Sequence, residues 1–542
     1  MSKTMTMDSF SRNAVESFVQ TVVFVDDKIY APSPRGTVVE AKQVVGPKAR
    51  KPALKSSEVK AHTVSVDTSE KTEEVSSFSP HDIQASFAKK RIVCSLHQPL
   101  KKNSMGIESD TYRLCASADI VIVDWDLYGD DGEKAKTLIE NLVLQSLEEN
   151  PHQLRLVLIY TDNPNLFDIA DKASEKLTAQ IFDKDVDKGL AFHTLNARVV
   201  VLGKPAKRLE EFKLFEVDEA DLADRAISEF CKLTDGMLQG GILMGLATIR
   251  KQSRKILTKF HSGLDAAFLT HRALSLPHEE AFDHITPLLV AEIQAVLEDT
   301  LGSPLFPDAV VDDWCNRKIY GKHAQALIQG AAISSFAADF CHFGYEATTK
   351  HHLNPTPTKK QLQALLCPDD KSIPTPQPDV SSLEQLAVLM SQRTHYDNQR
   401  RFLKLGAILR EMNGQKRYLL CLQPVCECSR LSGSNPFLFC YLDESQKKVT
   451  HIVPNGDGYS ELSFNPSKEN RAIIEFSANH KKRVAADGTT GSGYQFFDNK
   501  ENEYQWIAQL KPEHAQRAAE QFARELSRVG LTESEWLRLK AS

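Results

Sequence analysis

Features typical of membrane and secreted proteins are missing from this chain of 542 residues. No uninterrupted apolar run reaches the length of a membrane span, and the first residues lack the apolar core of a signal peptide. The ten cysteines are scattered along the chain rather than grouped as in a disulfide framework. We therefore expect a cytoplasmic protein with reduced thiols and without a membrane partner.

An excess of positive charge is also missing. The formal net charge is -6 at pH 7, and 41% of the residues are hydrophobic and 25% charged, as in an ordinary globular protein. A negative balance argues against a general attraction to nucleic acid. No segment is typical of a helix-turn-helix with a basic recognition helix, so nucleic acid is not expected as a partner.

Motifs of several common enzyme classes are absent as well. The chain has no Walker loop, no GxGxxG after a strand, no GxSxG elbow and no HExxH. His271, His278 and His284 do not have the spacing of metal ligands, and no ATP-binding module of a histidine kinase is visible. These absences direct attention to the residues that follow the predicted strands.

The most informative stretch is a short apolar run followed by an acid. Ile120–Val123 has the continuous apolar character of a strand that is buried on both faces, and Asp124 follows it directly. In open α/β sheets, ligands and chemistry collect at the carboxyl ends of the strands. A helical pattern begins soon after Gly132, so the stretch predicts a strand, a loop with a functional carboxylate, and a helix.

Three other apolar runs, at about 21–25, 154–160 and 198–203, also end in polar side chains. The polar residues at their ends are, in chain order, Asp26 and Asp27, Thr161, and Lys204 followed by a proline. Each of these endings is common alone, whereas the ordered set is specific. The set resembles the receiver domains of two-component response regulators over about residues 18–212.

This resemblance implies a doubly wound α/β domain with a parallel five-stranded, flavodoxin-like sheet. It implies that a histidine kinase phosphorylates the chain and that Mg²⁺ is the cofactor. The implied roles are phosphoacceptor for Asp124, metal ligands for Asp26, Asp27, Asp124 and the backbone carbonyl of Asp126, switch hydroxyl for Thr161, and phosphate partner for Lys204.

The chemistry of these residues agrees with the implied roles. A carboxylate can accept a phosphoryl group as an acyl phosphate. Mg²⁺ binds a few carboxylate oxygens and offsets charge on the transferring group. A lysine ammonium pairs with phosphate oxygens, and a threonine hydroxyl can bond to them.

Four features depart from the receiver pattern. Val201 stands where receivers carry an aromatic residue, and Tyr128 stands where proline is common. The stretch between Thr161 and Lys204 is long. Residues from about 31 to 80 are rich in Pro, Lys, Ser, Thr and Glu, which predicts a disordered insertion that is either a tolerated surface loop or a tether for a partner.

Beyond the receiver domain, the periodicity changes twice. The predicted domains are the receiver domain (1–212), an α-helical domain (213–350), a linker with helices (351–415), and a β-rich, small barrel-like module with a C-terminal helix (416–542). Helices are expected at Leu383–Met390 and Arg400–Arg410. The nearly all-apolar stretch Met237–Ile249 indicates either a close contact between helices or the seam of a homodimer.

The cysteines of the β-rich module leave two interpretations open. Cys421, Cys426, Cys428 and Cys440 lack the paired CxxC spacing of a zinc site, and cysteine is common as a small buried residue. A structural role is therefore favoured. The alternative is a catalytic site near Cys426 and Cys428 in an effector enzyme that phosphorylation switches on.

The leading hypothesis is a receiver protein of a phosphorelay, with no catalysis beyond its own phosphorylation and dephosphorylation. The architecture is similar to that of receiver-bearing proteins in bacterial defensive two-component (Detocs) anti-phage systems. That resemblance implies a role in buffering stray phosphoryl groups, and a second receiver protein with an effector domain as a further partner. A transcriptional regulator with an unusual DNA-binding module is the third hypothesis.

Overall fold

The computed structural model describes most of the chain. The described residues are 5–30, 79–149, 153–179, 181, 183–194, 197–206, 208–275, 284–301, 305–319, 333–351, 358–367, 381–396, 400–445, 447–456, 458–489, 493–527, 536 and 539–540. Apart from its last two residues, the predicted insertion at about 31–80 lies outside them. The chain divides into unit 1 (Met1–Ile256 and Ile293–Lys318) and unit 2 (Leu257–Glu292 and Ile319–Ser542).

A seven-stranded sheet in the order β2-β1-β3-β4-β7-β6-β5 forms the centre of unit 1. Its parallel strands are β2 (Val93–His97), β1 (Thr21–Val25), β3 (Ile120–Val123), β4 (Arg155–Thr161) and β7 (Ala197–Gly203). All residues of β3, β4 and β7 are buried, as expected for strands covered on both faces. The predicted five-stranded parallel sheet is therefore confirmed.

Two short antiparallel strands extend this sheet at the β7 edge. They are β5 (Asp183–Val186) and β6 (Ala191–His193), and β6 pairs with β7. Ala191 and Phe192 are buried, so the hairpin covers backbone groups that an edge strand would leave exposed. The hairpin accounts for the long stretch between Thr161 and Lys204.

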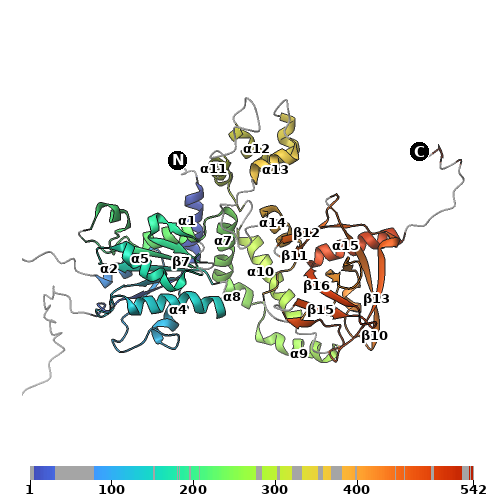
Figure 1. Cartoon of the computed structure of the whole chain (residues 1–542), viewed down its shortest axis with the longest axis horizontal. Helices are drawn as coiled ribbons and strands as arrows, with labels where there is room; N and C mark the ends of the chain where they lie inside the picture. Colours follow the sequence, from blue (N-terminus) through green and yellow to red (C-terminus); the bar gives the residue numbers. More distant parts are fainter. Residues whose placement is uncertain are drawn as a thin grey trace, which may run out of the picture. The chain divides into compact units, whose positions relative to one another are not determined.

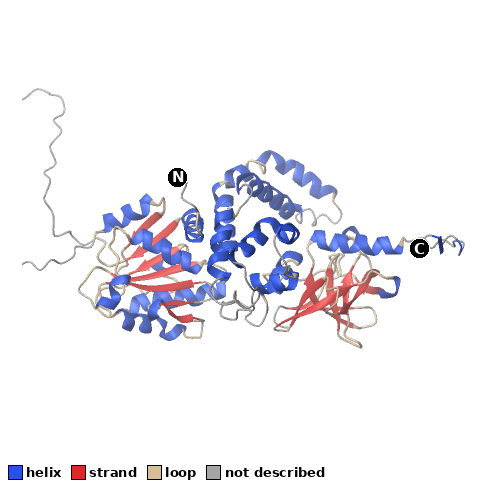
Figure 2. Ribbon diagram, turned by 90° about the horizontal axis from the view of Figure 1, so that it is seen from above, coloured by secondary structure: helices blue, strands red, loops and turns tan. Residues whose placement is uncertain are grey.

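Helices cover both faces of the sheet in unit 1 (Figure 2). One layer contains α2 (Pro80–Lys89) and α6 (Leu222–Leu233), which contact each other, and the other contains α3 (Asp110–Ala116), α4 (Glu133–Glu149) and α5 (Leu166–Ser174). Side chains of Ser79, Ser109 and Asn165 cap α2, α3 and α5 by accepting bonds from backbone N–H groups. The domain is therefore doubly wound.

Figure 1 labels the next helices along the chain, which lie in the predicted α-helical domain and, at 359–366, in the predicted linker. They are α7 (Met237–Lys251), α8 (Ser253–Leu257), α9 (Asp265–Leu274), α10 (Ile285–Leu301), α11 (Asp308–Ile319), α12 (Ile333–His351) and α13 (Lys359–Leu366). Helix α7 packs on the N-terminal helix α1 (Met7–Phe18). A Cβ atom on Gly240 would lie 2.8 Å from the ring of Phe10, so the glycine permits this close helix contact.

A nine-stranded sheet forms the centre of unit 2, in the order β11-β12-β10-β9-β8-β16-β15-β14, with β13 paired to β10. Its strands are β8 (Ala407–Glu411), β9 (Tyr418–Cys421), β10 (Ser434–Glu444), β11 (His451–Asn455), β12 (Gly458–Phe464), β13 (Arg471–Ser477), β14 (Asp487–Thr489), β15 (Gly493–Phe497) and β16 (Glu503–Gln509). Helices α14 (Ser382–Ser391) and α15 (Pro512–Leu526) complete the unit. All neighbouring strands are antiparallel, and the predicted β-rich module is confirmed.

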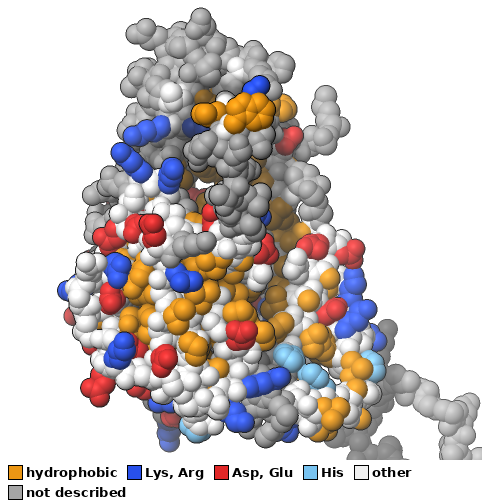
Figure 3. Space-filling view, turned by 90° about the vertical axis from the view of Figure 1, so that its right-hand side faces the viewer, with side chains coloured by type: hydrophobic (Ala, Val, Ile, Leu, Met, Phe, Trp, Pro, Cys, Tyr) orange, Lys and Arg blue, Asp and Glu red, His pale blue; other side chains and the backbone are white. Residues whose placement is uncertain are grey.

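Apolar side chains cover both faces of the sheet in unit 2. One core cluster contains Phe437, Phe439 and Phe476, and a second contains Ala515 and Phe522 of α15. Some hydrophobic side chains stay at the surface, and Figure 3 shows a face on which they gather among charged side chains. Exposed apolar atoms are normal on folded proteins, so they need no special explanation.

The predicted helix at Arg400–Arg410 is wrong, because its last residues belong to strand β8. Ile408 and Leu409 are fully buried and pair with both β9 and β16, so tertiary pairing overrides helix propensity. Gly406 has a φ of 83°, which no α-helix contains.

Two general findings concern the whole described chain. All ten cysteines are free thiols. Among the described residues, no helix combines the length and the apolar character needed to cross a membrane.

Candidate functional site

Three of the predicted site residues meet at the carboxyl edge of the sheet in unit 1. The Lys204 ammonium donates to Asp124 Oδ1 at 2.7 Å and to Asp26 Oδ2 at 3.0 Å. Their exposed fractions are 7% for Lys204, 2% for Asp124 and 0% for Asp26. One ammonium therefore bridges two carboxylates with little access to water.

Strand register brings these residues together. Val25 of β1 pairs with Val123 of β3, so Asp26 and Asp124 follow at the same level, and Asp124 N–H donates to the Val25 carbonyl at 2.9 Å. Lys204 follows β7, which is separated from β3 by β4. The long lysine side chain reaches across β4 to the two acids.

The charges of the cluster affect one another. Burial raises the pKa of Asp124 to about 7; the nearby Asp26 carboxylate also raises it, and Lys204 opposes the rise. Burial acts to lower the pKa of Lys204, but its interactions with Asp124 and Asp26 outweigh this and raise it. The cluster therefore favours the protonated form of Lys204, whose positive charge lies between Asp124 and Asp26.

Asp27 adds a third acid to the group. Its Oδ2 accepts the Tyr128 N–H at 2.9 Å, whereas its Oδ1 is buried without a hydrogen-bond partner among the described residues. Oxygens of Asp26, Asp27 and Asp124 all lie within 4.8 Å of one another. Mg²⁺ binds carboxylate oxygens, and a buried oxygen without a partner is costly, so this donor set fits a magnesium ion.

Tyr128 explains one departure from the receiver pattern. Its backbone has a φ of 66°, and its N–H donates to Asp27. Proline has no N–H and a φ fixed near about −65°, so it could supply neither feature. The Tyr128 hydroxyl donates to the Pro99 carbonyl at 2.5 Å, which ties the loop after β3 to the loop after β2.

The loop after β3 closes over a buried tryptophan. Trp125 is 2% exposed, and a Cβ atom on Gly132 would lie 2.0 Å from its indole ring. Gly132 also has a φ of 89°, so both space and backbone conformation require glycine there. Asp126 is exposed in this loop, where its carboxylate accepts the Asp131 N–H at 3.3 Å; the use of its backbone carbonyl stays a prediction.

Thr161 lies at the end of β4 and is 1% exposed. Its hydroxyl oxygen accepts the Asn163 N–H at 3.1 Å, and its carbonyl accepts the Lys204 N–H at 2.7 Å. The predicted switch hydroxyl is therefore held at the same sheet edge as Lys204, with its own proton available for donation.

Arg208 is a residue of the site that was not predicted from the sequence. Its guanidinium donates to the carbonyls of Asn163 (2.9 Å), Thr161 (2.8 Å) and Lys204, and its side chain is 0% exposed. Arg208 stands in a short basic stretch after Lys204, so no pattern distinguishes it from a surface arginine.

Tyr160 was missed as well. Its hydroxyl donates to the Val217 carbonyl at 2.7 Å, and the Lys204 ammonium lies 5.6 Å from the centre of its ring. Burial raises the pKa of this phenol above its ordinary value, so it stays protonated. A buried tyrosine inside an apolar run has no distinguishing signal in the sequence.

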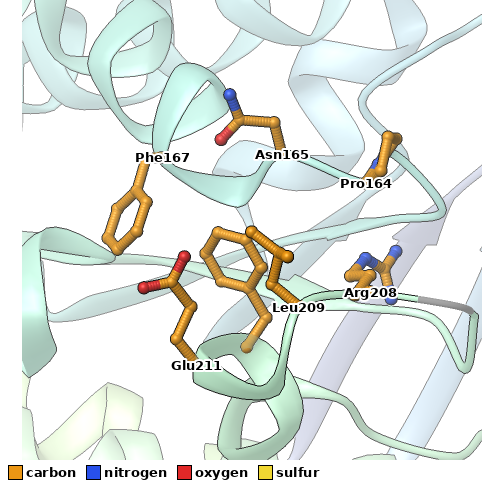
Figure 4. A pocket seen from close by; sticks show the side chains of 7 residues that line it. Pro164, Asn165, Phe167, Arg208, Leu209 and Glu211 are labelled. Atoms are coloured by element: carbon orange, nitrogen blue, oxygen red, sulfur yellow. The ribbon is translucent and has the colours of Figure 1, made fainter.

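An open pocket of about 610 Å³ lies beside Arg208 (Figure 4). It is lined by Pro164, Asn165, Phe167, Arg208, Leu209, Glu211 and Phe212. The rings of Phe167 and Phe212 are 5.0 Å apart, so the start of α5 packs against the 3₁₀ helix η3 (Glu210–Phe215).

Three of the four cysteines in the β-rich module have the properties of core residues. Cys421, Cys428 and Cys440 are buried, and burial raises the pKa of Cys428 and of Cys440 to about 12. Cys426 is exposed. Within the described residues, these thiols form no group that could hold a metal ion.

The fold and the site first define a class. A doubly wound sheet in which five parallel strands have the order 2-1-3-4-5, with an acidic cluster at the carboxyl edge, is a flavodoxin-like domain. Residues 18–209 match the family model of the response receiver domain, and this part of the chain is a receiver domain. The match covers well under half of the chain. Searches of curated proteins and of solved structures found no match.

A receiver domain gives the chain a receiver role in a two-component system. It also implies a histidine kinase or another phosphodonor as partner.

Proposed function

We propose that Asp124 accepts a phosphoryl group from a phosphohistidine of a histidine kinase, with Mg²⁺ held by Asp26, Asp27, Asp124 and the backbone carbonyl of Asp126. The observation that carries this proposal is the buried Asp124–Lys204–Asp26 cluster at the carboxyl edge of a receiver sheet. Bound there, Mg²⁺ would offset negative charge on the transferring group.

Asp124 is the nucleophile in this reaction. A carboxylate oxygen of Asp124 attacks the phosphorus, the phosphorus–nitrogen bond breaks, and its electron pair remains on the imidazole of the kinase. Lys204 already donates to Oδ1 of Asp124, so we assign the attack to Oδ2. The product is an acyl phosphate.

Lys204 and Thr161 act on the phosphoryl group after transfer. The Lys204 ammonium exchanges its bond to Asp124 for a bond to a phosphoryl oxygen. The Thr161 hydroxyl, which accepts a hydrogen bond from Asn163 N–H, donates a hydrogen bond to a second phosphoryl oxygen. Both contacts stabilise the acyl phosphate.

The direct test uses acetyl phosphate and Mg²⁺ as the phosphodonor mixture. The wild-type chain should gain one phosphoryl group that hydroxylamine removes, as expected of an acyl phosphate. Asp124→Asn should gain none, because an amide cannot form this bond. Equal labelling of Asp124→Asn would falsify the proposal.

We further propose that the chain absorbs stray phosphoryl groups from a kinase that also serves a second receiver protein with an effector domain, in bacterial anti-phage defence. The support is the resemblance of its sequence architecture to proteins of such systems. Added to the kinase and the second receiver, the wild-type chain should lower phosphorylation of that receiver. If Asp124→Asn lowered it equally, buffering by phosphoryl transfer would be wrong.

A further inference from the structure

We propose that Arg208 is a positioning residue that holds Thr161 and Lys204 for phosphoryl transfer and conveys phosphorylation to the connector before α6, residues 210–217. This inference rests on the proposed function of Asp124. The buried guanidinium of Arg208 contacts three backbone carbonyls and one carboxylate.

Arg208 connects two loops at the site. Its Nε donates to Asn163 O at 2.9 Å and its Nη2 to Thr161 O at 2.8 Å, both after or at the end of β4, while Nη1 donates to Lys204 O after β7. A guanidinium has five donors in one plane, so it can hold several acceptors in a fixed arrangement. A lysine could not reproduce this geometry.

Arg208 also reaches the connector to α6. Its Nη1 lies 3.3 Å from a carboxylate oxygen of Glu216, and its side chain is 0% exposed, so this charged contact is shielded from water on the arginine side. The backbone of Glu216 forms an isolated parallel β-bridge with that of Gly203, in which Val217 N–H donates to the Gly203 carbonyl at 3.0 Å. The connector is thereby attached to the end of β7.

Gly203 makes room for this arrangement. A Cβ atom at Gly203 would lie 2.6 Å from Arg208 Nη1, so a larger residue would displace the guanidinium. The close approach joins the end of β7, Arg208 and Glu216 in one packed group.

These contacts can transmit a structural change at the phosphorylation site to the connector before α6. If Thr161 moves toward a phosphoryl oxygen, its carbonyl moves with it, and the bond to Arg208 must lengthen or carry the guanidinium along. The arginine is bonded to Glu216, so the connector with η3 then shifts. Val201, which stands where receivers carry an aromatic residue, is 1% exposed and has no polar side-chain atom. Its side chain therefore cannot transmit the change through a hydrogen bond.

The test compares Arg208→Lys with Arg155→Lys in the full-length chain. Arg155 is a matched control, because it is 2% exposed and donates to the carbonyls of Leu142 and Ala116, both at 2.8 Å, from the start of β4. Arg208→Lys should lower the maximal rate of labelling by acetyl phosphate roughly tenfold to a hundredfold. Arg155→Lys should leave this rate unchanged.

Two further readouts separate positioning from a general loss of structure. In the described part of the chain, Arg208 donates to three backbone carbonyls and to Glu216 but not to Asp26, Asp27 or Asp124. The Mg²⁺ affinity of Arg208→Lys should therefore equal that of the wild type. Hydrogen exchange of residues 210–217 should change on phosphorylation in the wild type and in Arg155→Lys, but not in Arg208→Lys.

The outcomes distinguish this inference from the proposed function. A wild-type chain that is not labelled on Asp124 refutes the function itself. A labelled wild type together with an Arg208→Lys variant that has the same rate and the same exchange response refutes the inference alone. If Arg208→Lys does not fold, Glu216→Gln replaces it: labelling should persist while the exchange response is lost, and an intact response overturns the relay to the connector.

Discussion

The two ends of β7 each carry a buried cation, and the two cations have different surroundings. Arg198, near the start of the strand, contacts Glu229 at 2.7 Å as well as Asp187 and His193, and Glu229 also contacts Arg225 at 2.9 Å and Lys232 at 3.1 Å. Lys204, after the end of the strand, bridges Asp124 and Asp26. Cations outnumber acids at the first site, and acids outnumber the cation at the second.

This difference separates a structural charge cluster from a functional one. The carboxylate of Glu229 is 1% exposed and has three cationic partners, so its charge is fully compensated. At the other end, Asp27 Oδ1 is buried without a partner among the described residues. An excess of buried acid oxygens is what a divalent cation and a phosphoryl group would complete.

The largest expected effect concerns the compensated cluster. Glu229→Gln removes the buried acid that faces Arg198 and leaves Arg198 with Asp187, a partly exposed acid. Breaking the buried pair should lower the free energy of unfolding by about 3–5 kcal/mol. Urea denaturation measures this. The labelling rate of the folded protein should not change, since Glu229 contacts no residue of the phosphorylation site.

Glu210→Gln is the control for that variant. Glu210 pairs with Lys213, but the two side chains are 84% and 59% exposed, and exposed ion pairs contribute little to stability. A loss of stability as large in Glu210→Gln as in Glu229→Gln would contradict the distinction between the two kinds of pair.

The next effect concerns the acid-rich end. Lys204→Met removes the ammonium that pairs with the phosphoryl group, and the labelling rate should fall by about a hundredfold. The same variant should bind Mg²⁺ more tightly, because the competing cation between Asp124 and Asp26 is gone. Kinetics with acetyl phosphate and a Mg²⁺ titration give the two values. Weaker Mg²⁺ binding would show that Lys204 does not compete with the ion.

The smallest effect is a dependence on pH. The pKa of Asp124 is raised to about 7, and only the ionised carboxylate attacks phosphorus, so labelling should become faster as the pH rises through about 7. Below that value the rate should fall by about tenfold per pH unit. Mg²⁺ favours the ionised form, so more Mg²⁺ should move the profile to lower pH. If the pH profile of the labelling rate did not change with the Mg²⁺ concentration, the ion would not bind next to Asp124.

Strand ends were predictable from the sequence because parallel strands bring them to one edge. The apolar run before Asp124 and the run before Asp26 fixed both strands, and register then placed the acids together. The receiver fold and the meeting of Asp124, Asp26 and Lys204 were predicted from the resemblance of the ordered strand endings to those of receiver domains.

Contacts that depend on distant backbone were not predictable. Arg208 binds carbonyls, which carry no signature in the sequence. Strand β8 contains Ile408 and Leu409, whose apolar character suits a helix or a strand, and only pairing with β9 and β16 decides between them. The sequence showed only that the stretch between Thr161 and Lys204 is long, and it did not indicate that this stretch contains strands β5 and β6.

The most direct measurement locates the phosphoryl group on the chain. Borohydride reduces an acyl phosphate on aspartate to homoserine, and mass spectrometry of peptides identifies the residue. After treatment of the wild-type chain with acetyl phosphate, Mg²⁺ and borohydride, we expect homoserine in place of Asp124. Homoserine at another aspartate, or at none under conditions that label the chain, would contradict it.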